Sequence, residues 1–199
     1  MRLTDLRFVP GHKHGGQQRP WTTITGVTLH QTACVLGEDP NRWLTCGAHF
    51  GVTRGGDVFW LHPIECRTVH AHKLNATTVG IELDGHYSGI AGDQSTYWKP
   101  KGSRRVPLHP TPELVASAIQ TIRWISAELT FYGGALRYLY AHRQASADRQ
   151  SDPGSEIWKA VALPAMAELR LTAGPKDFTL GDGLPIPEAW DPRCQGVPY

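Results

Sequence analysis

Two residues ten positions apart, His142 and Asp152, are of types that could bind one metal ion together. His142 closes a short aromatic and apolar run, and Asp152 begins an Asp-Pro-Gly turn. Histidine nitrogen and carboxylate oxygen both suit zinc, and a catalytic zinc typically takes three protein ligands and keeps one position open for water. His30, which ends an early apolar segment, is the best candidate for the third ligand. The three residues predict a zinc hydrolase, although an ordinary turn and a surface histidine would explain the first two alone.

Composition sets limits on the class of protein. The 199 residues fit one domain with extensions and can bury a sizeable core. A net charge of +2 is too small to predict nucleic-acid binding. No segment approaches the length of a transmembrane span, and the N-terminus lacks the apolar core of a secretory signal. The four cysteines form no CxxC pair, so we expect free thiols.

The elements that must carry the three ligands can be read from hydrophobic patterning. Residues 24–32 alternate as a strand, with Val27 and Leu29 on one side and His30 on the other. The apolar side can meet helices, which leaves His30 free to face a cleft. Residues 135–141 predict a second strand that delivers His142 at its carboxyl end.

A hairpin and one further strand are expected between these ligands. Residues 48–53 and 58–61 flank a glycine-rich turn at 54–57, which is typical of a β-hairpin. Residues 78–83 read as a strand on which Glu82 lies opposite the apolar side chains. The segment 85–110, with Tyr97, Trp98 and several basic residues, predicts a long loop that is either functional or a solvated excursion.

Helix signals follow. Thr111 is a good N-cap before a proline and a glutamate, and apolar residues then recur at helical spacing until Gly133-Gly134. Residues 41–45 predict a short helix, and residues 155–171 a longer one that Pro164 should break or kink. Residues 1–23 read as a polar loop.

This order of elements predicts an α/β fold, a single domain with a central mixed sheet flanked by helices. We expect the domain to span residues 1–172, with its core at 24–171. The proline- and glycine-rich residues 173–199 should form an extension packed on its surface. Ligand sites in such folds lie beyond strand ends, where His30 and His142 both fall.

Five short motifs in this chain occur in a recognisable order: VTLHQT at 27–32, AHFGVTRGGD at 48–57, VHA at 69–71 with an asparagine at 75, VGIELDG at 79–85, and the histidine at 142 with DPG at 152–154. In these motifs, over roughly residues 24–158, the chain resembles the zinc-dependent N-acetylmuramoyl-L-alanine amidases of the type 2 amidase and peptidoglycan-recognition-protein family. The resemblance implies that His30, His142 and Asp152 bind Zn²⁺.

The resemblance also implies roles for other residues. Glu82 matches the catalytic carboxylate, which would take a proton from the attacking water and pass it to the leaving amine. His70 and Asn75 match positions that contact glycan or stem peptide, with hydrogen bonding at the sheet edge and a loop turn as the alternatives. Trp98 joins them as a candidate substrate-binding residue. The hairpin histidine His49 is expected to be structural.

Two departures from the family pattern matter. Many relatives have a lysine two positions before the third ligand, where its charge can stabilise the oxyanion, and this chain has Gln150 there. A glutamine can still donate a hydrogen bond, so Gln150 is a candidate catalytic residue of a slower enzyme. Arg149 could compensate, yet adjacent residues in an extended turn usually point apart. Ala48 replaces a tyrosine found in some relatives, which favours the branch that relies on a glutamate.

The sequence therefore predicts an enzyme that cleaves the amide between N-acetylmuramic acid and L-alanine in peptidoglycan. The alternatives are a binding module of the same fold that does not cut, and a zinc hydrolase of another amide. We expect a monomer whose partner is peptidoglycan or a muropeptide, without nucleic acid or membrane insertion. It would be made in the cytoplasm and act on the bacterial wall after release or export, as a phage lysis enzyme or an effector does, or act in wall recycling.

Overall fold

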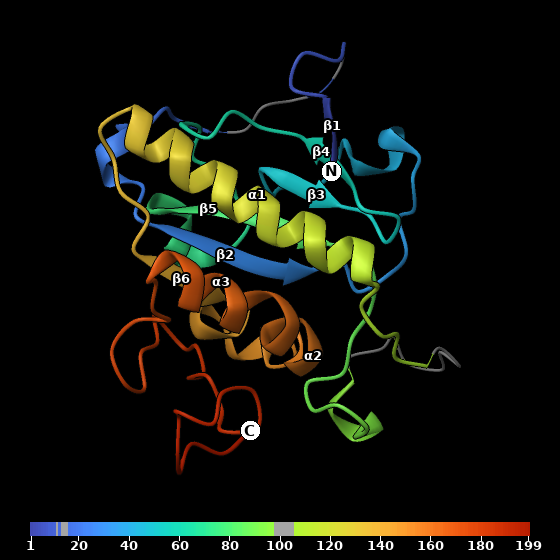
Figure 1. Ribbon diagram of the computed structural model, residues 1–199, viewed down its shortest axis with the longest axis vertical. Helices are drawn as coiled ribbons and strands as arrows, with labels where there is room; N and C mark the ends of the chain where they lie inside the picture. Colours follow the sequence, from blue (N-terminus) through green and yellow to red (C-terminus); the bar gives the residue numbers. More distant parts are fainter. Residues whose placement is uncertain (11, 13–15, 98–105) are drawn as a thin grey trace.

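A computed structural model describes residues 1–10, 12, 16–97 and 106–199, and its centre is a six-stranded sheet (Figure 1). The strand order is β1-β4-β3-β5-β2-β6. Neighbouring strands are parallel except for the antiparallel pair of β3 and β4, so the predicted mixed sheet is confirmed. The strands are β1 Arg2–Asp5, β2 Gly26–Gln31, β3 Phe50–Val52, β4 Asp57–Trp60, β5 Thr78–Leu83 and β6 Tyr138–Ala141.

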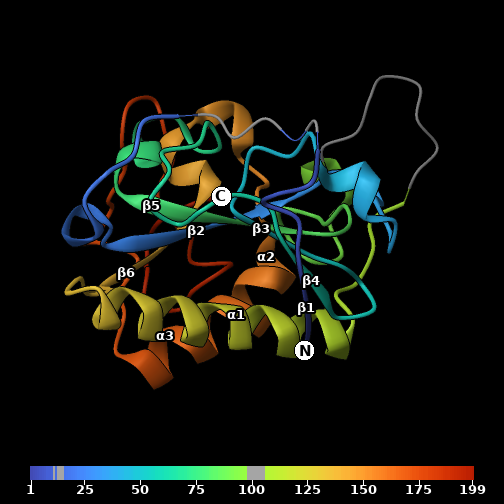
Figure 2. The ribbon, with the colours of Figure 1, turned by 90° about the horizontal axis from the view of Figure 1, so that it is seen from above.

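The two faces of the sheet carry different kinds of side chain. Val27 and Leu29 of β2 are fully buried in the main apolar cluster, which includes the inner side of helix α1, Pro112–Phe131. Figure 2 shows α1 and α3, Leu163–Leu169, together on one side of the sheet. His30 and Glu82 belong to the opposite face, because side chains alternate along a strand. They are paired across the parallel strands β2 and β5, which places two candidate site residues side by side.

Helix α1 begins and ends as its sequence predicts. Thr111 is the N-cap, and its side chain accepts a hydrogen bond from the Leu114 N–H. Pro112 occupies the first turn, where a missing N–H costs nothing. Gly133 has φ 78°, a left-handed conformation that glycine adopts without strain and that turns the chain after the helix.

The predicted disruption near Pro164 takes the form of a wider helical turn. The helix α2, Ser155–Ile157, continues into a π-helical turn, Trp158–Ala162, and then into α3. Proline has no N–H to donate and its ring crowds the carbonyl four residues earlier. The π turn lets the chain remain helical across that position. The helix ends at Leu169, two residues before the predicted end, because Arg170 is left-handed with φ 57°.

Several other boundaries differ from the sequence prediction. Residues 2–5, expected in a loop, form the edge strand β1 beside β4. Their pattern is too polar and short to have indicated a strand. The strand expected from residue 135 begins only at Tyr138, and the short helix expected at 41–45 is a 3-10 helix, Pro40–Trp43. The long segment after β5 contains a further 3-10 turn, Gln94–Thr96.

Residues 173–199 are in contact with the segment that follows β6. Trp190 is fully buried, and its ring centre lies 6.0 Å from that of Trp158. Its indole N–H donates a hydrogen bond to the Gly89 carbonyl. The backbone carbonyls of Arg143 and Gln144 accept hydrogen bonds from residues 184 and 180. The carboxyl-terminal segment is therefore attached directly beside His142. None of the helices in the described ranges combines the length and the apolarity that a membrane span requires.

Candidate metal centre and catalytic carboxylate

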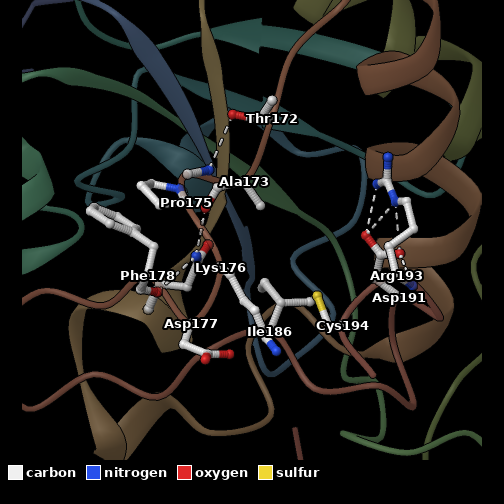
Figure 3. Close-up of a pocket in the computed structure, with 12 residues that line it drawn as sticks. Thr172, Ala173, Pro175, Lys176, Asp177, Phe178, Ile186, Asp191, Arg193 and Cys194 are labelled. Atoms are coloured by element: carbon white, nitrogen blue, oxygen red, sulfur yellow. Dashed lines mark hydrogen bonds and ion pairs between the residues drawn. The ribbon is translucent and has the colours of Figure 1, made fainter. Parts of the chain in front are cut away.

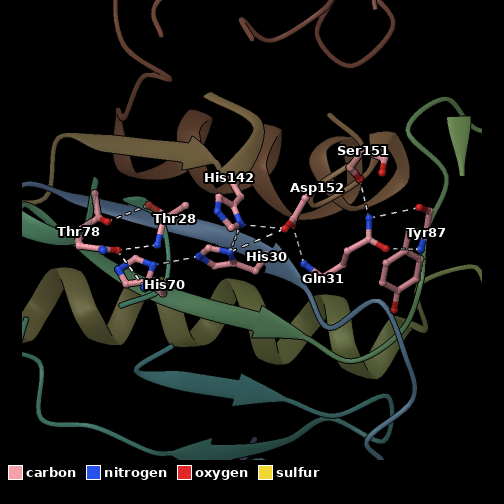
Figure 4. A network of polar contacts seen from close by, with 11 residues as sticks. Thr28, His30, Gln31, His70, Thr78, Tyr87, His142, Ser151 and Asp152 are labelled. Atoms are coloured by element: carbon pink, nitrogen blue, oxygen red, sulfur yellow. Dashed lines mark hydrogen bonds and ion pairs between the residues drawn. The ribbon is translucent and has the colours of Figure 1, made fainter. Parts of the chain in front are cut away.

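Three buried side chains converge at the carboxyl ends of β2 and β6. His30 lies near the end of β2, and His142 follows β6 immediately. Because these strands are parallel neighbours, their ends meet at one edge of the sheet. Asp152 arrives from the turn after His142, and its ligand oxygen lies with the imidazole nitrogens within 4.8 Å of one another (Figure 4).

The three donor atoms lie close enough together to share one ion. His30 Nδ1 lies 2.9 Å from His142 Nδ1, and Asp152 Oδ2 lies 3.0 Å from His142 Nδ1 and 3.9 Å from His30 Nδ1. Ligand atoms about 2.0–2.2 Å from a tetrahedral zinc are separated by roughly 3.3–3.6 Å. The three edges of this triangle scatter around that value. Two imidazoles and one carboxylate thus face a common point, which is the donor set predicted from the sequence.

Other groups hold the three side chains in orientation. Asp152 Oδ1 accepts the Gln31 N–H at 2.8 Å, which turns Oδ2 towards the imidazoles. The Gln31 amide in turn donates to the carbonyls of Tyr87 and Ser151 and accepts the Tyr87 N–H. On the far side of the site, His30 Nε2 contacts His70 Nδ1 at 3.0 Å. Partners of this kind fix the tautomer and ring orientation of a metal ligand.

Burial keeps His30 and His70 uncharged. Desolvation lowers the pKa of His30 well below its ordinary value, and the neighbouring His142 lowers it further. Desolvation, followed by the charge of Arg19, lowers the pKa of His70 to about 3. A metal ligand must be neutral imidazole, so this environment prepares His30 for binding without a proton to displace.

Glu82 occupies the same face as His30. Burial and, after it, the charge of Asp152 raise the pKa of its carboxyl to about 8, and the charge of Arg149 opposes the rise. Its Oε2 is buried without a hydrogen-bond partner among the described residues, as is His142 Nε2. A buried carboxylate with a raised pKa and an unused oxygen can accept and return a proton near neutral pH.

The other predicted site residues have more specific surroundings than the sequence indicated. Asn75 is buried, and its side-chain oxygen accepts the N–H groups of His70 and Ala71, which matches the loop-turn alternative. His49 is fully buried and accepts the Gly80 N–H, as a structural histidine does. Trp98 lies outside the described residues.

Gln150 and Arg149 line different cavities, as expected of neighbours that point apart. Arg149 lines a cavity of about 30 Å³ together with Gln31 and Asp152. This volume is enough for about one water-sized group. Gln150 is exposed and borders a separate cavity with Tyr97 and Tyr199. Both side chains are exposed; Arg149 borders the cavity beside Asp152, and Gln150 borders the other one.

Arg143 was not identified from the sequence. It is 1% exposed, and it donates to the Gln150 carbonyl at 2.8 Å while its N–H donates to the Asp152 carbonyl. Its guanidinium lies 5.0 Å from the ring centres of both Trp190 and Tyr199. An arginine next to a ligand histidine looks like a solvated charge in the sequence. The only signal was the aromatic content of the distant carboxyl-terminal segment.

A further cavity of about 280 Å³ lies between residues 172–178 and 186–194 (Figure 3). Its lining includes none of the three candidate ligands. The Asp191 carboxylate there is paired with Arg193 at 2.7 Å, and Cys194 is nearby. This cavity is therefore distinct from the candidate metal centre.

The fold and the converging ligands define an α/β domain with a candidate metal centre at the strand ends. A family model described as N-acetylmuramoyl-L-alanine amidase matches residues 20–155. The chain belongs to this Amidase_2 family. The match contains all three candidate ligands and Glu82, and it ends before the carboxyl-terminal segment.

Solved structures share the fold at low sequence identity. The amidase LysC from Clostridium intestinale is 14% identical with a TM-score of 0.58, over 86% of this chain and 99% of that one. Drosophila PGRP-LB is 17% identical with a TM-score of 0.54, over 78% and 89% of the two chains. A complex of peptidoglycan recognition proteins LCa and LCx with tracheal cytotoxin is 18% identical with a TM-score of 0.54, over 78% and 92%. A search of the curated proteins found no match.

Proposed function

We propose that this protein is a zinc-dependent N-acetylmuramoyl-L-alanine amidase that cleaves the bond between N-acetylmuramic acid and L-alanine in peptidoglycan. The observation that carries the proposal is the convergence of His30, His142 and Asp152 beside Glu82. Family membership supports the reaction. Zinc, when bound, supplies a Lewis acid and lowers the pKa of water to about 7.

The residues of the chain would have separate roles in holding the ion and in transferring protons. His30, His142 and Asp152 would hold the ion, and Gln31 and His70 would keep two of these ligands in orientation. Glu82 would accept the proton of the attacking water and donate it to the amine that leaves with L-alanine. General acid–base catalysis of this kind contributes about 10²–10⁴ in rate.

Arg149 is proposed as the group that favours negative charge on the substrate carbonyl oxygen. It lines the small cavity at Asp152, and its charge opposes the raised pKa of Glu82. Removing one donor to such an oxygen typically costs about 10²–10³ in rate. Gln150 would contribute little to this step, because its side chain borders the other cavity.

Zinc-loaded protein incubated with a purified muropeptide tests the proposal. We expect free stem peptide and intact sugar by mass spectrometry, no cleavage after chelation, and recovery when zinc is restored. Uncut muropeptide in the presence of stoichiometric bound zinc would refute the amidase activity.

The second candidate is a peptidoglycan-binding module that does not cut. The specific observation in its favour is the neutral Gln150, placed where many relatives carry lysine. Glu82→Gln separates the two functions. An amidase loses cleavage and keeps muropeptide binding, whereas in a binding module wild type and variant bind alike and neither cleaves.

The domain bounds, the oligomeric state and the biological setting are proposed from the sequence and the family match. The catalytic domain would span residues 1–172, with residues 173–199 as an extension. The protein would act as a monomer on peptidoglycan or its fragments, in lysis of the wall, attack on it, or recycling. Digestion of whole sacculi would favour the first two, and activity restricted to fragments would favour recycling.

A further inference from the structure

A polar cavity of about 300 Å³ adjoins the candidate metal centre and is not used by the proposed reaction. Three segments far apart in the sequence build it: the turn at 95–97, the loop at 147–151 and Tyr199. Asp148 and Ser151 line both this cavity and the small one beside Asp152. A group bound here would therefore be adjacent to whatever occupies the metal centre.

Tyr199 is held as one wall of this cavity by several contacts. Its ring lies 5.0 Å from the Arg143 guanidinium, and its hydroxyl donates to the Thr96 carbonyl at 3.4 Å. Arg143 is itself fixed, since it is buried and bonded to the Gln150 carbonyl. These contacts position Tyr199 before any ligand arrives, and a preorganised wall reduces the entropy cost of binding.

The residues that line the cavity favour one chemical class of ligand. It combines the rings of Tyr97 and Tyr199 with hydroxyl and amide groups from Ser95, Ser151 and Gln150. Among the side chains of the described residues that line it, Asp148 alone carries a formal charge, and that charge repels carboxylates. The volume is at the lower end of the range for ligand sites, about 300–1,000 Å³.

We propose that this cavity is a glycan subsite, which binds an uncharged N-acetylated sugar ring of the substrate. The apolar C–H face of a pyranose can lie against a tyrosine ring while its hydroxyls bond to the polar groups. The substrate of the proposed amidase has two arms, a glycan and a peptide that ends in a carboxylate. Asp148 disfavours the peptide, so the sugar arm extends towards Tyr199 and the peptide arm away from it.

This subsite rests on the proposed function, and its residue Tyr199 lies outside the segment that matches the family model. It adds a substrate orientation to the reaction. It also gives part of the carboxyl-terminal segment a role in recognition.

Two measurements on the zinc-loaded full chain test the subsite. The first is binding of tri-N-acetylchitotriose, monitored by NMR or calorimetry. We expect saturable binding that Tyr199→Ala abolishes. The second compares cleavage of a sugar-bearing muropeptide with that of the matching D-lactyl peptide, which lacks the sugar. Tyr199→Ala should raise KM tenfold or more for the muropeptide and less than twofold for the lactyl peptide, with kcat unchanged.

Control variants separate recognition from folding. Tyr199→Phe keeps the ring and should retain most of the affinity. Tyr132→Ala removes a half-exposed tyrosine that stacks on Trp21 elsewhere, and should behave as wild type. Ala147→Phe obstructs the cavity while keeping the Tyr199 side chain, and should reproduce the selective KM effect even if Tyr199→Ala unfolds.

Equal KM changes for both substrates, or chitotriose binding that survives both Tyr199→Ala and Ala147→Phe, would overturn the subsite. These outcomes leave cleavage by wild type intact. If wild type cleaves neither substrate, the proposed amidase function fails instead, and chitotriose binding still tests the cavity by itself.

Discussion

Replacing Glu82 by glutamine is expected to have opposite effects on activity and on stability. The variant keeps the size of the side chain but can no longer take up or release a proton. We expect amidase activity to fall by about 10²–10⁴ because general acid–base catalysis is lost. We also expect the zinc-free variant to be more stable than wild type at alkaline pH.

The stability effect follows from the pKa of Glu82. Burial and then the charge of Asp152 raise this pKa from 4.5 to about 8. The folded protein therefore holds the proton more tightly than the unfolded chain. The stability that the neutral carboxyl provides is complete below about pH 4.5 and is lost as pH rises to about 8. At 1.36 kcal/mol per pH unit, the upper limit of the loss is about 5 kcal/mol.

Urea unfolding of zinc-free wild type and Glu82→Gln between pH 5 and pH 9 measures this loss directly. The difference in unfolding free energy should be below about 1 kcal/mol at pH 5 and reach about 2–5 kcal/mol in favour of the variant at pH 9. Groups that do not interact with Glu82 titrate alike in both proteins and cancel. A pH-independent difference would refute the buried, raised-pKa carboxyl, and full activity of the variant would refute its catalytic role.

Three further perturbations test the surroundings of the site. His70→Gln removes the contact with His30 Nε2 and should weaken zinc binding about 10–100-fold in a chelator competition. Substitution of a residue that only binds substrate would leave the zinc affinity unchanged. Arg149→Gln should lower kcat by about 10²–10³, while Gln150→Ala lowers it less than about threefold; the reverse order would restore Gln150 to the catalytic role. Trp190→Ala should reduce the free energy of unfolding by about 3–5 kcal/mol, because the side chain is fully buried against Trp158. A smaller loss in urea unfolding would mean that the carboxyl-terminal segment is loosely attached.

The sequence predicted the parts of the fold that depend on local periodicity. The strand at 78–83, the capped start of α1 and the hairpin all follow from alternation, capping and turn residues. The edge strand β1 could not be predicted, because its four residues pair with β4 and bury little. The π turn before Pro164 was not predicted, because hydrophobic patterning indicates a break or kink at a proline but not its form.

The candidate site residues that belong to short sequence motifs could be predicted. His30, His142 and Asp152 converge because parallel strands bring their ends together. The contacts of Arg143 and Tyr199 join positions 56 residues apart in the sequence and depend on how the carboxyl-terminal segment returns to the domain. Likewise, the choice between Arg149 and Gln150 depends on the direction of two adjacent side chains, which only the folded loop defines.

Anomalous diffraction at the zinc absorption edge, from crystals of the zinc-loaded protein, tests the central claim most directly. The account predicts one strong peak about 2.0–2.2 Å from His30 Nδ1, His142 Nδ1 and an Asp152 oxygen. A peak at other residues, or no peak in protein that retains the fold, would contradict it.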